Sequence, residues 1–129
     1  MQMQMTTALW CVFGAGLLPY LATSIAKAGG ERYNNRDPRE WLERQQGFRR
    51  RADNAQRNGF EAFPFFAAAV IVAQLVGAPQ DRVDALALIF IVARVVYTIC
   101  YVADWHWVRS VAWLIGWICT VTLFVTGAG

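Results

Sequence analysis

The sequence predicts an all-α integral membrane protein, a four-helix bundle in which each long helix crosses the bilayer once. Hydrophobic residues make up 57% of the chain and charged residues only 16%, well below the roughly 25% of an average soluble domain. Nine of the twelve Lys and Arg residues lie between Lys27 and Arg57, so the long segments elsewhere are almost uncharged. A length of 129 residues indicates a single domain, 1–129. The predicted helices cover residues 5–28, 38–78, 83–103 and 108–127.

The first predicted span, Met5–Ala26, carries no charge. At about 1.5 Å per residue it is long enough to cross a hydrocarbon core of ~30 Å. A cleaved signal peptide is the alternative, but it would need a basic start, and residues 1–10 contain no Lys or Arg. We therefore expect a retained helix, kinked at Pro19, where one backbone hydrogen bond is lost.

The second predicted helix starts in a polar, strongly basic connector. Asp37 is suited to the N-cap and Pro38 to the first helical position, which indicates a helix start here. The helix is expected to continue into the uncharged span 62–79, with a possible interruption at Gly47. A tight turn around Gly77 should end it.

The third span, 85–103, is interrupted only by Arg94, and the uncharged fourth span covers 110–126. Between them lies DWHWVR, residues 104–109, whose two tryptophans suit the headgroup level of a membrane. The positive-inside rule places the basic first connector and the third connector in the cytoplasm, and both termini on the opposite side. Because the basic residues cluster between apolar spans, they indicate membrane topology and no nucleic-acid partner.

The cysteines and the single histidine show no pattern typical of a metal site or a disulfide framework. Cys11, Cys100 and Cys119 each lie inside an apolar run and are expected to be small buried side chains. His106 is expected to be a loop residue at the membrane surface. We therefore predict no metal.

The polar residues of the last three spans are expected to gather in one membrane leaflet, where helical spacing places them on shared faces. They are Arg51, Asn54, Asn58 and Glu61 on the second helix, Arg94, Tyr97 and Tyr101 on the third, and Arg109 opening the fourth. An arginine at mid-depth costs at least ~2.5 kcal/mol and must face a partner or water. One interpretation is that Glu61 and Arg94 only neutralise each other. The other is a cation-rich pocket for a carboxylate-bearing ligand and a lipophilic substrate.

The segment RxxNAxxNxFEAFPFF, residues 51–66, is followed by ARVVYTICY and then by an Arg eight residues later. This pattern, over essentially the whole chain, resembles bacterial-type members of the MAPEG family, the membrane-associated proteins in eicosanoid and glutathione metabolism. The resemblance implies a homotrimer in the lipid bilayer, with glutathione as co-substrate bound between subunits near the cytoplasmic leaflet. Catalytic members activate the glutathione thiol against lipophilic electrophiles or lipid hydroperoxides, and others isomerise a prostaglandin.

The resemblance also implies roles for individual residues. Its catalytic residues would be Arg109, which stabilises the thiolate, and Tyr101. Its glutathione-binding residues would be Arg51, Asn54, Asn58, Glu61, Arg94 and Tyr97, with Glu61 suited to the α-amine of the peptide.

One position departs from the family pattern, because glutathione-using members commonly carry an arginine where this chain has Asn54. Arg51, one turn earlier, is the expected substitute, and Ala62 lacks the tyrosine of some members. The function predicted by the resemblance is a glutathione transferase or peroxidase. The alternative is a non-catalytic membrane protein of the same fold that binds a lipid or a partner. A small drug transporter fits less well, because its essential carboxylate usually lies in the first span.

Overall fold

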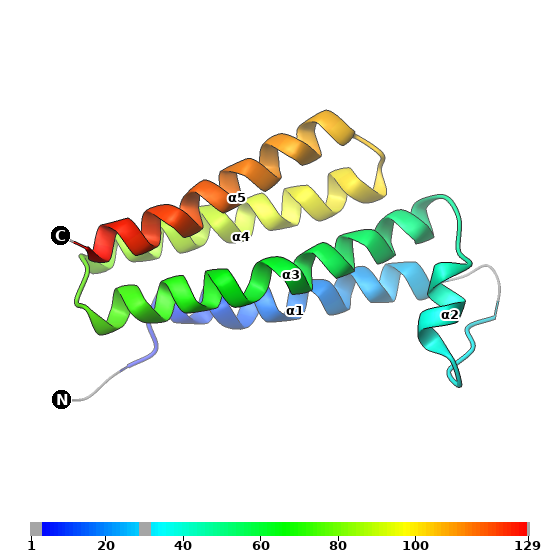
Figure 1. Ribbon diagram of the computed structural model, residues 1–129, viewed down its shortest axis with the longest axis horizontal. Coiled ribbons are helices and arrows are strands. Elements are labelled where there is room, and N and C mark those ends of the chain that lie inside the picture. Colours follow the sequence, from blue (N-terminus) through cyan, green and yellow to red (C-terminus); the bar gives the residue numbers. More distant parts are fainter. Residues whose placement is uncertain (1–3, 29–31, 129) are drawn as a thin grey trace.

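The computed structural model describes residues 4–28 and 32–128, and this part of the chain is all-helical, as predicted. Figure 1 shows two pairs of long helices side by side, with the short α2 at the end of the bundle opposite both termini. The helices are α1 (Thr7–Lys27), α2 (Pro38–Glu43), α3 (Phe48–Leu75), α4 (Gln80–Val102) and α5 (His106–Gly127). Residues 29–31 of the predicted first connector, and residues 1–3 and 129 of the predicted domain, lie outside the described residues.

The four long helices are each apolar and long enough to cross a membrane. The protein is therefore an integral, multi-pass membrane protein built as a four-helix bundle, which confirms the predicted fold class. Large apolar side chains are exposed around its outside, among them Trp10, Phe13 and Ile99. Such a surface suits contact with lipid chains, which carry no polar groups to satisfy.

Most helix bounds lie within three residues of the predicted ones. The segment predicted over 38–78 is divided into α2 and α3 by the interruption considered at Gly47, whose φ of 65° and ψ of −140° suit only glycine. α4 begins at Gln80, directly after its N-cap Pro79, whose ψ of 120° is not yet helical. His106 is the exposed first residue of α5, so placing it in a loop was wrong.

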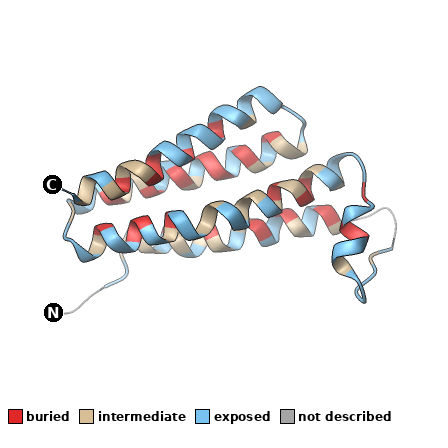
Figure 2. Cartoon of the chain, viewed as in Figure 1, coloured by how far each residue is buried: buried red, intermediate tan, exposed pale blue. Residues whose placement is uncertain are grey.

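Helix α1 packs along α3 through a stripe of small residues. Its buried positions recur every three or four residues, and they are Ala8, Cys11, Ala15, Pro19, Ala22 and Ala26. Small side chains allow two helix backbones to approach closely. At Gly59 of α3 the approach is so close that an added Cβ would lie 2.9 Å from Pro19 Cγ. Figure 2 shows the buried positions turned towards the inside of the bundle.

The centre of the bundle lies between α3 and α4, where the rings of Phe66 and Phe90 stack with their centroids 3.8 Å apart. Both rings are buried in the main apolar core. Cys11, Cys100 and Cys119 are also buried, as predicted for small apolar side chains.

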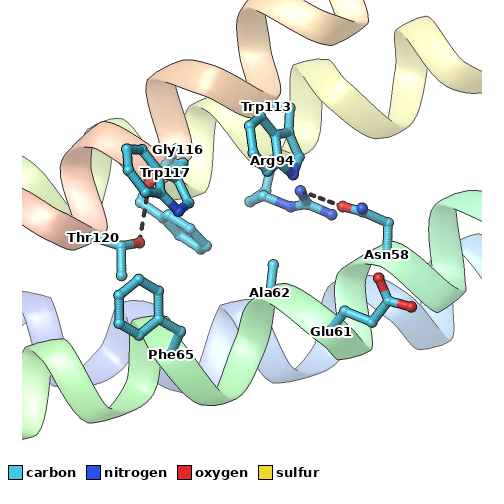
Figure 3. Close-up of a pocket in the computed structure, with 10 residues that line it drawn as sticks. Asn58, Glu61, Ala62, Phe65, Arg94, Trp113, Gly116, Trp117 and Thr120 are labelled. Atoms are coloured by element: carbon cyan, nitrogen blue, oxygen red, sulfur yellow. Dashed lines mark hydrogen bonds between the residues drawn. The ribbon is translucent and has the colours of Figure 1, made fainter.

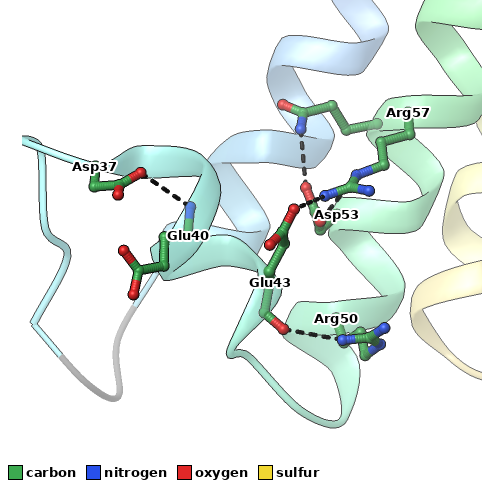
Figure 4. A network of polar contacts seen from close by, with 7 residues as sticks. Asp37, Glu40, Glu43, Arg50, Asp53 and Arg57 are labelled. Atoms are coloured by element: carbon green, nitrogen blue, oxygen red, sulfur yellow. Dashed lines mark hydrogen bonds and ion pairs between the residues drawn. The ribbon is translucent and has the colours of Figure 1, made fainter.

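The first connector folds back onto the bundle through α2. Asp37 caps this helix as predicted, its Oδ1 accepting from the Glu40 amide at 3.3 Å (Figure 4). Trp41 is fully buried, and its indole Nε1 donates to the Arg32 carbonyl at 2.8 Å. Together with Leu42 it forms a small core against the ends of α1 and α3. The basic connector is therefore a packed part of the fold.

At the opposite end of the bundle, a carboxylate of α4 holds the start of α1. Asp84 Oδ1 accepts from the Ala8 amide at 2.9 Å and from Gln80 Nε2 at 2.8 Å. The Thr6 hydroxyl accepts from the Leu9 amide at 3.1 Å. Two of the four amides that a helix start leaves without partners are thus satisfied, one of them from another helix.

Candidate functional site

A cavity of about 290 Å³ lies between α3, α4 and α5 (Figure 3). Its polar end is formed by Asn58, Glu61 and Arg94, three of the residues predicted for the site. Its other end is mostly apolar, and the remaining lining residues are Ala62, Phe65, Phe90, Trp113, Gly116, Trp117 and Thr120. We call this space the main cavity. Its lining can receive a polar group at one end and an apolar group at the other.

Arg94 is the most buried of the site's cations, with 5% of its surface exposed. Its Nη1 donates to Asn58 Oδ1 at 2.8 Å. No ion pair joins it to Glu61 in the described part of the chain, where the two ion pairs link Arg57 to Glu43 and to Asp53. Glu61 and Arg94 therefore form no direct ion pair, and a neutral amide accepts from Arg94 instead.

From Arg94 a row of stacked cations and rings continues to α5. The Arg94 guanidinium lies 4.2 Å from the centroid of the Tyr97 ring, and Arg109 lies 4.2 Å from that of Tyr101. The two tyrosine rings meet edge to face at 5.6 Å. Tyr97 and Tyr101 can contact in this way because they are four residues apart on one helix face. We call the row from Asn58 to Arg109 the polar ladder.

Beside the ladder lies a second hollow of about 220 Å³. Its lining residues are Tyr97, Tyr101, Arg109, Ser110 and Trp113. Trp113 also lines the main cavity, so the two spaces share one wall. Six of the eight predicted site residues thus line one or the other space.

The two remaining predicted residues lie elsewhere. Arg51 donates from Nε to the carbonyl oxygen of Val102 at 3.1 Å, at the end of α4. Asn54 is half-buried, one turn before Asn58 on α3. Neither is among the residues that line the main cavity or the second hollow. The structure therefore brings six of the predicted residues, from α3, α4 and α5, together around these spaces, while Arg51 and Asn54 line neither of them.

The sequence did not identify the face that α5 contributes to the main cavity. Trp113, Gly116, Trp117 and Thr120 are spaced by three, one and three residues, which places them on one side of a helix. That spacing could have indicated a shared face of α5. In an uncharged span, however, the residue types do not distinguish a face that lines a cavity from one that contacts lipid. The Thr120 hydroxyl donates to the Gly116 carbonyl at 3.0 Å, as Figure 3 shows, so its proton is already engaged.

Comparisons with known proteins gave one result. A family model described as the MAPEG family matches residues 7–129, nearly the whole chain. No curated protein matches the chain, and no solved structure does.

Proposed function

The chain belongs to the MAPEG family, and on that premise we propose that it is a membrane-embedded, glutathione-dependent transferase or peroxidase. Its substrates are lipophilic electrophiles or lipid hydroperoxides. Membership makes it a membrane protein of the glutathione and eicosanoid metabolism family. The observation that carries the proposal is the polar ladder beside a cavity that is polar at one end and apolar at the other.

Glutathione binds along the ladder in this proposal. It carries two carboxylates, for which Arg94 and Arg109 supply cations, and one α-ammonium, for which Glu61 supplies a carboxylate. Glu61 is exposed, lines the main cavity and has no ion-pair partner in the described part of the chain. Tyr97 and Asn58 give the remaining contacts, and Asn54 is a further amide one turn away. A carboxylate inside a membrane span is costly unless a cation reaches it. The α-ammonium of glutathione is such a cation for Glu61, which favours pairing the two.

Arg109 stabilises the glutathione thiolate. A free thiol has a pKa of about 8.5, and a nearby cation lowers it, so that more of the thiol is ionised at neutral pH. The ring of Tyr101 lies under the Arg109 guanidinium and limits its orientations. Tyr101 also lines the second hollow, and in this proposal its hydroxyl donates to the sulfur.

The lipophilic substrate occupies the apolar end of the main cavity. Phe65 and Trp117 line this end, and both are exposed on the outside of the bundle, so a substrate can enter from the lipid. In a substitution the thiolate sulfur forms a bond to the electrophilic carbon, and the leaving group departs with the electron pair of the bond that breaks. In an addition nothing leaves, and the neighbouring carbanion or alkoxide that forms takes up a proton. In a peroxidase reaction two glutathiones give one disulfide, while the hydroperoxide becomes an alcohol and water.

Assembly and orientation follow the family in this proposal. The protein is a homotrimer, with the basic connector and the turn between α4 and α5 in the cytoplasm. Both features lie at the same end of the bundle as the polar ladder, and both termini lie at the other (Figure 1). Glutathione, which is water-soluble, then reaches the ladder from the cytoplasm while the second substrate arrives through the bilayer.

A glutathione titration of the purified protein in nanodiscs tests the proposal. We expect binding and an ultraviolet signal from the thiolate. Arg109→Ala should abolish that signal while the trimer mass is unchanged. Arg82→Ala, an exposed arginine near the opposite end of α4, is the matched control and should bind as the native chain does. Absence of binding at millimolar glutathione would refute the proposal and favour a non-catalytic lipid-binding member of the family.

A further inference from the structure

Three consecutive arginines at the start of α3 each donate a hydrogen bond to a backbone carbonyl at the end of a different helix. The bonds join Arg49 Nε and Nη2 to Ala28 (3.0 and 2.9 Å), Arg50 Nη1 to Glu43 (3.0 Å, Figure 4) and Arg51 Nε to Val102 (3.1 Å). Ala28 caps α1, Glu43 ends α2 and Val102 ends α4. The last carbonyls of a helix lack backbone partners and carry the negative end of its dipole, so guanidinium groups suit them.

The bond from Arg51 completes the hydrogen bonding at the end of α4. In the turn that follows this helix, three backbone amides donate back to three carbonyls: Ala103 to Ile99, Asp104 to Tyr101 and Trp105 to Cys100. The next carbonyl is that of Val102, and it accepts from Arg51. A carbonyl left without a donor in a partly buried place is unfavourable. Arg51 therefore has a defined task in the fold.

This task affects the polar ladder. Val102 directly follows Tyr101, whose ring contacts both Tyr97 and Arg109. Arg51 itself lies two turns before Asn58, which begins the ladder on α3. The bond thus ties the two helices together next to the rings that must stay aligned.

We infer that Arg51 is a positioning residue, which holds the carboxyl end of α4, and with it Tyr101, against the start of α3. For catalysis this inference rests on the proposed function of the ladder. It differs from the expectation that Arg51 replaces the missing arginine at Asn54 as a carboxylate ligand. A ligand role depends on the charge of the guanidinium, whereas the positioning role depends on one N–H group.

Two substitutions separate these roles. Glutamine places its amide nitrogen at the same number of bonds from Cα as the Nε of arginine, so Arg51→Gln keeps the donor and removes the charge. Methionine places a methyl group there, so Arg51→Met removes both. Arg50→Met is the matched control, since it releases the end of α2 and leaves α4 untouched.

Hydrogen exchange of the Ala103, Asp104 and Trp105 amides, measured without glutathione, tests whether Arg51 holds the carboxyl end of α4. One lost hydrogen bond of ~1 kcal/mol corresponds to about fivefold faster exchange in Arg51→Met. Arg51→Gln and Arg50→Met should match the native chain. Equal exchange in Arg51→Met and the native chain would overturn the inference.

The thiolate signal at saturating glutathione tests the effect on the ladder. We expect Arg51→Gln to retain the signal and the native affinity, and Arg51→Met to lose most of the signal. Equal loss of affinity in both variants would show that Arg51 is a carboxylate ligand and overturn the inference. If the native chain binds no glutathione, the proposed function fails, while the exchange experiment still decides whether Arg51 holds α4.

Discussion

Replacing Asn58 with alanine removes the oxygen to which the buried Arg94 guanidinium donates at 2.8 Å. A hydrogen bond to a charged group contributes about 1.5–3 kcal/mol, and removing one partner of a buried ion pair costs about 3–5 kcal/mol. The lower range applies here, because the Tyr97 ring remains beneath the cation and the main cavity can admit water. We therefore expect Asn58→Ala to lower the free energy of unfolding by about 2 kcal/mol.

The assay is an unfolding titration with sodium dodecyl sulfate in mixed micelles, followed by tryptophan fluorescence. Asn58→Asp keeps the acceptor oxygen and should be at least as stable as the native chain. Asn58→Ala combined with Arg94→Met removes both polar partners, so it should regain much of the stability lost in Asn58→Ala alone. A double variant that is less stable than Asn58→Ala, or a loss below about 0.5 kcal/mol in the single one, would refute this account of Arg94.

Three further changes can be measured by the same titration. Gly59→Ala should cost about 1–3 kcal/mol, because the new Cβ would lie 2.9 Å from Pro19 Cγ, in a ring that cannot move aside. Asp84→Ala should cost about 1 kcal/mol, because the Ala8 amide loses its acceptor at the start of α1. Asp104→Gly should raise the free energy of unfolding by as much as about 1 kcal/mol, because the φ of 65° at this position is unfavourable for a residue with a side chain.

Each of these changes has a control within the chain. Gly14→Ala should be nearly neutral, since its Cβ would meet Ile91 Cδ1 at an ordinary 3.7 Å. Asp81→Ala removes an exposed acid of the first turn of α4, three residues before Asp84, and should cost less than Asp84→Ala. Asp104→Ala should be less stable than Asp104→Gly. A reversed order in any pair would contradict the geometric reason given for it.

The positions of the spans could be predicted because a helix that crosses a bilayer must be long and apolar, so the hydrophobic segments of the sequence locate them. The break at Gly47 and the cap at Asp37 could also be predicted, because each depends on the conformation or the side chain of a single residue. The shared face of Arg94, Tyr97 and Tyr101 followed from spacing within one helix.

Contacts between helices could not be predicted in the same way. Asn58 and Glu61 lie three residues apart on one face of α3, and the sequence does not say which of them reaches Arg94. The answer depends on the rotation and depth of α3 against α4, which the packing of Phe66 on Phe90 helps to set. The acceptor of Arg51 could not be predicted either, because every residue has a backbone carbonyl and the residue type does not show which one accepts.

The arginines at the start of α3 also bear on the order in which the chain can assemble. The carbonyls that accept from Arg49 and Arg50 precede them in the sequence, so both bonds can form as soon as α3 begins to fold. The acceptor of Arg51 is synthesised 51 residues later, a delay of roughly 3–10 s at ~5–20 residues per second. During that interval Arg51 lacks the carbonyl to which it donates in the folded protein. The hydrogen bond by which Arg51 joins α3 to α4 can thus form only after the third span has been synthesised.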